Sequence, residues 1–401
     1  MSYPDENTVR ISEAESGNLN TEKSRRAPKT RVLSQLRIPR TNACLERLDF
    51  MIPSTGRQAI LVNIEENGNQ IKALFCGGHT TPAYQDDAPV TNRAFIISLD
   101  VNQKQVSAIQ EIPGMKVKRW GHRASILHNG KVFIAGGGDD SRCELFSPGT
   151  SEFEYCGKLN HARSGHEQEL LANGKVIIIG GYAKGENKKG TVQSIECFNP
   201  AADEIKEVAN LEFGRAAHRI ALINNEIYVI GGSSSTKVEK FNATSMAVED
   251  SGITLPIPLK DFGLHVEGNK IYLIGGTNAE SKISSNAIYE LDITSKKVRE
   301  LKCKLSVARE DLLVISSPDK NQIMAVSGEI KDQDPKIDGE KTGVVELIDL
   351  GLETTKKIIS RNVFRDDARS IEVAPGTHFI AGGTIDKQDT FCQGGHILSF
   401  H

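Results

Sequence analysis

The chain has 401 residues, of which 38% are hydrophobic and 25% are charged, so it can form packed cores of ordinary globular composition. No apolar run approaches the roughly 18 residues of a membrane-spanning helix, and the first residues lack the apolar core of a secretory signal. We therefore expect a cytoplasmic protein, with a non-classically secreted or translocated effector as the alternative. The net charge of −3 gives no general case for nucleic-acid binding.

The seven cysteines are odd in number and include no Cys-x-x-Cys pair. This pattern argues against a disulfide framework and against a zinc site. We expect small buried side chains at these positions, and we expect neither a metal nor another cofactor.

Glycine pairs follow short apolar runs at intervals of about 44 to 59 residues. Such a spacing is typical of radial repeat architectures. Each run holds four to six residues, mostly valine, isoleucine, tyrosine, phenylalanine and alanine, which suits a strand buried on both faces. The endings, in chain order, are at Gly78, Gly137, Gly181, Gly232, Gly276, Gly328 and Gly383; Ser327 replaces the first glycine of the sixth pair.

Each run belongs to a unit of four strands. A turn such as Asn129-Gly130 or Asn173-Gly174 precedes the run and predicts a hairpin with an earlier strand, called a, so that the run is strand b. A third strand, c, follows at a variable distance, and a fourth, d, begins seven residues after a marker residue of c. Five units share this step, whereas the unit around Ile348 does not. Four strands per unit predict the blades of a propeller.

The last unit ends with its c strand at the C-terminus and lacks a fourth strand. We expect the segment 32–38 to supply it and to close the ring, because closure removes exposed strand edges. The sequence thus predicts an all-β fold: a seven-bladed propeller of four-stranded antiparallel blades, with six blades as the alternative. Residues 1–30 are predicted to be a disordered polar tail, and residues 31–401 the propeller.

With these features assembled, the chain resembles the kelch-repeat family, in particular its bacterial version. The resemblance rests on the apolar run with Gly-Gly, on an acidic residue plus phenylalanine in strand c, and on an arginine about ten residues into the next segment. Glu144 with Phe146 and Arg163 after Phe153 are examples. Two departures stand out: the tryptophan usual in strand d is absent, and phenylalanine or an aliphatic residue replaces the tyrosine of strand c.

Arg-x-x-His occurs three times between strands d and a, where the loops are expected to gather at one rim with the b–c loops. A partial ring of guanidinium groups suits recognition of carboxylate or phosphate. The competing interpretation is that these arginines belong to the repeat and bind backbone carbonyls. The candidate binding residues are Arg119, His122, Arg163, His166, Arg215 and His218.

Lysines of the variable loops extend this predicted rim. Lys184, Lys188 and Lys189 lie in one b–c loop, and Lys116, Lys118 and Arg123 lie in the neighbouring unit. We expect a non-enzymatic interaction module, a monomer that binds another protein through a short acidic segment. Ordinary solubilising loops are the alternative interpretation.

Enzymatic alternatives are weighed on the same fold. The copper-radical oxidases that share it need tyrosine, histidine and cysteine ligands, for which we find no matching arrangement. The kelch-like sialic-acid mutarotases need arginine, glutamate and histidine in the central pocket, so binding or isomerisation of an acidic sugar is the runner-up function. Four adjacent acidic pairs lie in or near rim loops, but neighbours on an extended strand point to opposite faces, so no acid–base pair is expected. These pairs are Asp86-Asp87, Asp139-Asp140, Glu310-Asp311 and Asp366-Asp367.

Overall fold

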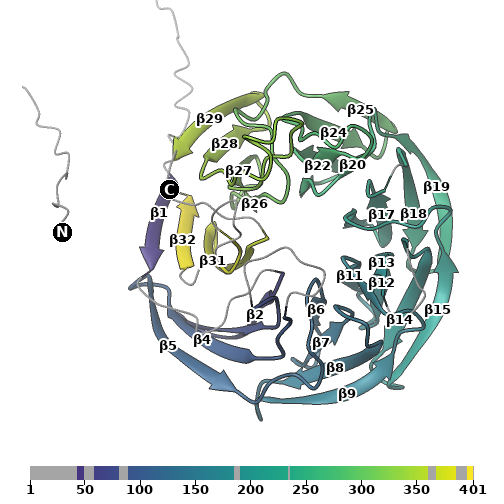
Figure 1. Cartoon of the computed structure of the whole chain (residues 1–401), viewed down its shortest axis with the longest axis vertical. Coiled ribbons are helices and arrows are strands. Elements are labelled where there is room, and N and C mark those ends of the chain that lie inside the picture. Colours follow the sequence, from purple (N-terminus) through teal and green to yellow (C-terminus); the bar gives the residue numbers. More distant parts are fainter. Residues whose placement is uncertain are drawn as a thin grey trace, which may run out of the picture. The chain divides into compact units, whose positions relative to one another are not determined.

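A computed structural model describes residues 43–80, 89–184, 190–233, 235–359, 367–384 and 395–400, except 49–57, and only the backbone of 43–48. All of these residues belong to one compact unit, Thr41–His401. The described residues form strands and no helices, and they build seven four-stranded antiparallel sheets around a common axis (Figure 1). The predicted seven-bladed all-β propeller is confirmed. No helix in the described part of the chain is long and apolar enough to cross a membrane.

The strands follow the chain from the innermost position of each blade outward. Blade 1 holds β2 (Ile60–Asn67), β3 (Gln70–Cys76), β4 (Ala94–Asp100) and β5 (Gln105–Ile112). Blade 2 holds β6 (Arg123–Ile126), β7 (Val132–Ala135), β8 (Arg142–Ser147) and β9 (Glu152–Lys158). Blade 3 holds β11 (Glu167–Leu170), β12 (Val176–Ile179), β14 (Ser194–Asn199) and β15 (Glu204–Asn210). Blade 4 holds β16 (Arg219–Ile223), β17 (Glu226–Ile230), β18 (Lys237–Asn242) and β19 (Ala247–Thr254).

The remaining blades repeat this order. Blade 5 holds β21 (Gly263–Glu267), β22 (Lys270–Ile274), β24 (Ile288–Asp292) and β25 (Lys297–Glu300). Blade 6 holds β26 (Leu313–Ser316), β27 (Gln322–Val326), β28 (Val345–Asp349) and β29 (Thr354–Ile359). Blade 7 holds β30 (Arg369–Ala374), β31 (Thr377–Ala381), β32 (Gly395–Phe400) and β1 (Ala43–Leu48).

The ring is closed by an N-terminal strand, as expected, but by a different one. Strand β1 pairs antiparallel with β32 from Ala43↔Phe400 to Leu48↔Gly395, and the two lie side by side in Figure 1. The prediction that residues 32–38 fill this place is wrong, because a later segment, Ala43–Leu48, fills it. Residues 32–38 lie outside the described residues. A strand at the outer edge pairs on one side only, so its sequence ACLERL needs less apolar content than an inner strand.

The seven-residue step between strands c and d also holds in the unit where the sequence does not show it. Ile348 of β28 pairs with Thr355 of β29, just as Phe146 pairs with Phe153 in blade 2. The step is recognised in the sequence by an apolar residue at the start of strand d. Blade 6 has the polar Thr355 at this position, so its step is not visible in the sequence.

Apolar side chains of neighbouring blades form the cores. Phe75 and Phe95 of blade 1 pack with Phe379 and Ile397 of blade 7 in one buried cluster. Burial of about 25 cal/mol per Å² of apolar surface makes such clusters the main stabilising contribution, so the ring is closed by packing as well as by strand pairing. The described cysteine side chains are buried thiols, as predicted: Cys76, Cys143, Cys156, Cys197 and Cys303.

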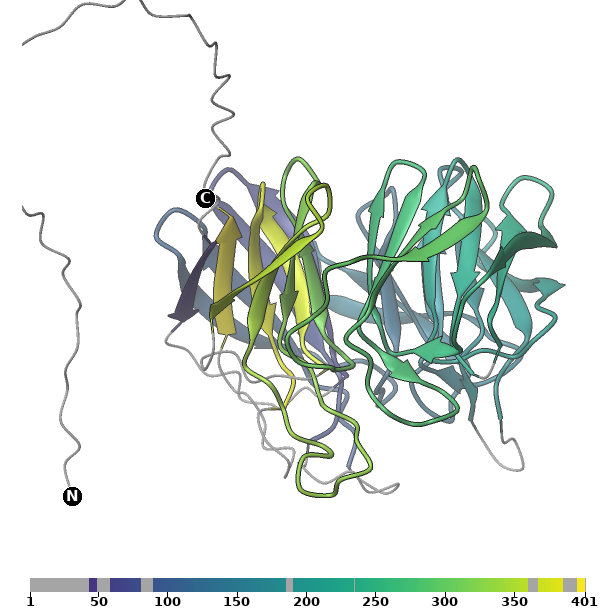
Figure 2. The ribbon, with the colours of Figure 1, turned by 90° about the horizontal axis from the view of Figure 1, so that it is seen from above.

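The d–a and b–c loops meet at one end of the ring, as predicted. Two-stranded pairs join them: β10 (Arg163–Ser164) with β13 (Tyr182–Ala183), and β20 (Leu259–Lys260) with β23 (Thr277–Asn278). Figure 2 shows the long yellow-green loop between β27 and β28 projecting beyond the strands at one end. This end of the ring is called the loop rim below.

In the first five pairs, the first glycine is required by space as well as by backbone angle. Gly180 has φ of +64°, and a Cβ atom there would lie 2.5 Å from the carbonyl oxygen of Arg215. Gly130 has φ of +79°, but a Cβ atom would meet nothing within 4 Å. Both are left-handed, so they differ chiefly in the space around them.

We therefore expect Gly180→Ala to destabilise the protein more than the matched control Gly130→Ala. The control should lose about 1–2 kcal/mol for the left-handed conformation alone. The backbone clash at Gly180 should add on the order of 2 kcal/mol more. Urea denaturation of both variants checks this; equal losses would show that the first glycine is needed only for its backbone angle.

Candidate functional site

The tips of the seven d–a loops surround the axis of the ring. The tip residue of every loop adopts a left-handed backbone, with φ between 51° and 59°. This conformation turns the chain sharply before each innermost strand begins. The tip residues, in blade order, are Gln58, Gly121, Gly165, Ala217, Asp261, Asp311 and Asp367.

Backbone hydrogen bonds join consecutive tips around the axis. Each amide donates to the carbonyl oxygen of the preceding tip at an N···O distance of 2.9 to 3.4 Å. The bonded tips run from Asp311 through Asp261, Ala217, Gly165 and Gly121 to Gln58. This chain of bonds holds the tip side chains in fixed positions, as a preorganised site requires.

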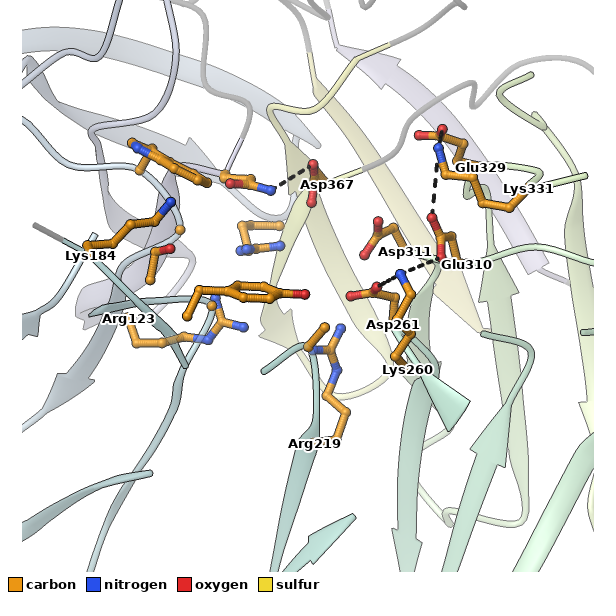
Figure 3. A pocket seen from close by; sticks show the side chains of 18 residues that line it. Arg123, Lys184, Arg219, Lys260, Asp261, Glu310, Asp311, Glu329, Lys331 and Asp367 are labelled. Atoms are coloured by element: carbon orange, nitrogen blue, oxygen red, sulfur yellow. Dashed lines mark hydrogen bonds and ion pairs between the residues drawn. The ribbon is translucent and has the colours of Figure 1, made fainter. Parts of the chain in front are cut away.

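The tips line a pocket of about 490 Å³ at the loop rim. Its walls draw residues from the loops before all seven blades, which places the pocket on the axis (Figure 3). A volume of this size suits a small molecule. Charged side chains dominate the walls: Arg123, Lys184, Arg219, Lys260, Asp261, Glu310, Asp311, Glu329, Lys331, Asp367 and Arg369.

Three arginines from the first residues of inner strands give the pocket a cationic side. Arg123 and Arg219 both bind Glu167, with Nη2···Oε1 and Nη1···Oε1 distances of 3.0 and 3.1 Å. Burial alone would raise the pKa of Glu167, but the charges of Arg123 and Arg219 outweigh it and hold the pKa at about 2. One carboxylate thus serves two guanidinium groups.

Arg369 has no such ion pair among the described residues, although Asp367 and Glu167 attract it at longer range. Its Nη1 donates to the carbonyl oxygen of Ala368 at 3.1 Å, and no carboxylate among the described residues lies within ion-pair distance. Burial and the charge of Arg123 lower the pKa of Arg369 to about 10, so the group remains a cation at neutral pH. A partly buried cation with two further guanidinium groups near it favours an anionic ligand.

The opposite side of the pocket is acidic. Lys260 Nζ lies 2.8 Å from Asp261 Oδ2 and 3.6 Å from Glu310 Oε2. Glu329 contacts both Lys331 and Lys341. Carboxylates and lysines therefore alternate along this wall.

Among the described carboxyl groups, Glu310 has the pKa that is raised furthest. Its side chain is 4% exposed. Burial, followed by the charge of Asp261, raises its pKa to about 7. An acid with this pKa can both donate and accept a proton near neutral pH.

Three buried oxygens in the pocket lining have no hydrogen-bond donor among the described residues. They are Gln58 Oε1, Ser164 Oγ and Glu310 Oε2. Buried polar atoms are rarely left without partners in native proteins. Each of these oxygens retains the capacity to accept a further hydrogen bond.

The predicted arginines do not line this pocket. Arg119, Arg163 and Arg215 are fully buried, and each forms an ion pair with the glutamate of its own blade. Each also donates to a carbonyl oxygen of the Gly-Gly turn; for Arg215, Nη1 lies 2.8 Å from Gly231 O. In these positions the arginines make the contacts that the structural interpretation expects, and their side chains are not exposed at the rim.

The predicted histidines are packing residues. His122, His166 and His218 are fully buried, with each imidazole against a Gly-Gly turn of the preceding blade. Phe262 occupies the same position in blade 5. Burial is the main cause that lowers the pKa of each ring, to about 3 at His218, so the imidazoles are neutral at pH 7.

Of the predicted lysines, Lys184 lines the pocket, where its Nζ lies 4.5 Å from the ring centroid of Trp120. Lys188 and Lys189 lie outside the described residues. Arg123, which was expected only as part of a basic rim, lines the pocket.

Most pocket residues are missed by the sequence analysis. Arg123 and Arg219 stand directly after the histidines of the repeated motif. Glu310 with Asp311, and Asp367, belong to acidic pairs that were set aside. Their position in the repeat is the signal that could have identified them. Each of these residues is the first, second or fourth after the repeated arginine of its own unit.

No family model and no curated protein matches the sequence. Among solved structures, the chain is similar to a fungal alcohol oxidase of the AA5 family in complex with copper. The TM-score is 0.67 at 14% sequence identity, over 87% of this chain and 75% of that one. At this identity the likeness shows a shared fold.

The prediction of a non-enzymatic protein-interaction module, with acidic-sugar binding as its alternative, is wrong. The oxidase of like fold named above is an enzyme. In addition, both versions of the prediction depend on Arg119, Arg163 and Arg215, which are buried in ion pairs within their blades. Of the predicted binding and rim residues within the described part of the chain, only Lys184 and Arg123 line the pocket.

Proposed function

We propose that the chain is an enzyme that binds a small polar molecule in the axial pocket and uses Glu310 as its proton-transfer group. The observation that carries the proposal is the environment of Glu310. It is a buried carboxyl with a pKa of about 7 that lines the pocket, and its Oε2 has no hydrogen-bond donor among the described residues. Arg369 supplies a cation for an anionic group of the substrate.

A substrate would be bound and oriented before proton transfer. The guanidinium groups of Arg123, Arg219 and Arg369 hold an anionic group, while Lys260 stabilises the carboxylate of Glu310 once its proton has left. Bound and preorganised charges of this kind need little rearrangement during the reaction. Proton transfer by a positioned side chain contributes about 10²–10⁴-fold to the rate.

Copper chemistry does not fit this pocket. Its described lining contains one tyrosine, Tyr182, and neither histidine nor cysteine. Nowhere in the described part of the chain do three histidine, cysteine, aspartate or glutamate side chains gather closely enough to hold a metal ion. We therefore derive no step through copper for this chain.

The reaction is tested by incubating the protein in D₂O with a panel of small hydroxy, keto and amino acids, followed by proton NMR. Wild type should convert at least one compound or exchange a carbon-bound hydrogen in it. Glu310→Gln should slow that process by at least about 100-fold. Full activity of the variant would remove Glu310 from the mechanism. The absence of any conversion and of any binding by wild type would contradict the proposal.

We also infer that the propeller is of kelch type. The support is the apolar run ending in Gly-Gly and the glutamate of strand c, which in blades 2, 3 and 4 holds the repeated arginine. A buried charged pair at one repeat position explains why both residue types recur together.

Three further predictions stand as proposals. The protein is a monomeric propeller, it resides in the cytoplasm, and residues 1–30 form a polar tail before a propeller of residues 31–401. Residues 1–42 lie outside the described residues.

A further inference from the structure

The two sides of the axial pocket differ in charge: arginines dominate one side, and carboxylates alternate with lysines on the other. Figure 3 shows Arg123 and Arg219 toward one side, Glu310 and Glu329 toward the other, and Asp261 between them. All of these side chains line the same pocket. A ligand with a single charge would meet a complementary wall and a repelling one.

We propose, on the basis of the pocket function above, that the substrate is a zwitterion: a small molecule with an anionic group and an ammonium group. The anionic group binds Arg369 and the neighbouring Arg123 and Arg219. The ammonium group binds Glu310 and Asp261. This pairing satisfies both walls at once.

The cationic side has a surplus of charge. Three guanidinium groups share the carboxylate of Glu167, which binds Arg123 and Arg219, and the longer-range attraction of Asp367 on the pocket wall. A carboxylate or sulfonate of the ligand can bind Arg369 through two parallel N–H···O bonds. Burial strengthens such a bond because little water competes for the donors.

One oxygen of the acidic side has an ion pair but no hydrogen-bond donor among the described residues. Lys260 lies closest to Asp261, at 2.8 Å, and 3.6 Å from Glu310 Oε2, which is too far for a hydrogen bond. That oxygen is buried and has no donor among the described residues. An ammonium group carries three donors and can bind Glu310 and Asp261 together.

Binding of an ammonium group should also displace a proton. The raised pKa of Glu310 shows that its carboxylate is poorly compensated in the free protein. A ligand cation beside it favours the ionised form and lowers that pKa. At pH 7, binding of a zwitterion should therefore release a fraction of a proton, whereas binding of a simple anion should not.

Titration calorimetry at pH 7 tests the proposal with ω-amino acids from glycine to 6-aminohexanoate. Butyrate and butylamine are the singly charged controls for 4-aminobutyrate. We expect at least one ω-amino acid to bind at least tenfold more tightly than the singly charged compounds of the same length. Its apparent heat should differ between phosphate and Tris buffers in proportion to the proton released.

Two variants separate the walls. Arg369→Gln should weaken the binding of both the amino acid and butyrate by at least tenfold. Glu310→Gln should weaken the binding of the amino acid, abolish the proton release on its binding, and leave the affinity for butyrate unchanged. Melting temperatures of both variants establish that the fold is retained.

Equal affinities for butyrate and 4-aminobutyrate across the series would overturn the zwitterion and leave an anion-binding pocket, so the proposed function would stand. If no ω-amino acid binds to wild type, the zwitterion is likewise rejected. The proposed function itself fails only if the D₂O panel also shows neither binding nor conversion.

Discussion

Replacing Glu196 with alanine should lower the free energy of unfolding by about 3–5 kcal/mol, because it leaves the guanidinium of Arg163 buried without its carboxylate. Both side chains are fully buried and in contact. Arg163 also donates from Nη1 to Gly180 O at 3.0 Å, and Glu196 Oε2 accepts the amide of Asn160 at 2.8 Å. The pair thus ties the entering loop to strand c and to the Gly-Gly turn.

The control for this prediction lies on the adjoining strand. Glu204 forms an ion pair with Lys206, and their side chains are 46% and 67% exposed. An exposed pair contributes at most about 1 kcal/mol, so Glu204→Ala should have little effect. Urea denaturation of both variants measures the difference. Similar losses in the two would show that the Arg163–Glu196 pair is not a structural element.

The second large effect is a dependence of folding stability on pH that is caused by the titration of Glu310. Its folded-state pKa of about 7 lies above the ordinary value of 4.5. As the pH rises from 4.5 to 7, the unfolded chain releases this proton while the folded protein retains it, so stability falls. Below 4.5 and above 7 both states have the same protonation and this contribution is constant. The total is on the order of 3 kcal/mol.

Glu310→Gln removes this titration while it keeps the shape of the side chain. Between pH 5 and pH 8 the variant should gain about 2–3 kcal/mol of stability relative to wild type. Chemical denaturation of both proteins at the two pH values gives the double difference. Glu167, with a pKa of about 2, titrates below this range and does not contribute. Parallel pH profiles of the two proteins would contradict the raised pKa.

The propeller could be predicted because its repeated signals are local. Gly-Gly turns, hairpin turns and apolar b strands each mark a place in the blade, and their spacing reveals the ring. The closing strand and the sixth c–d step were harder to recognise because edge and outer strands need few apolar residues. Thr355 keeps the register of its strand while it breaks the apolar pattern.

The sequence predicts that a site lies at the loop rim, but it does not identify most of the residues that line the pocket. The repeated arginines are the most visible charged residues, yet repetition marks a structural role: each one stabilises its own blade. Functional residues differ from blade to blade, so they interrupt the repeat. Glu310 and Asp311 were set aside as neighbours on an extended chain. The left-handed turn at Asp311 brings both side chains to the pocket instead.

The most direct test of the account is the titration of the Glu310 carboxyl group itself. Carbon-13 NMR of the glutamate side-chain carboxyls, with the signal assigned by its loss in Glu310→Gln, follows its ionisation. The structure predicts a midpoint of about 7. A midpoint near the ordinary value of 4.5 would mean that Glu310 is a simple ion-pair partner of Lys260 and that the pocket holds no proton-transfer group.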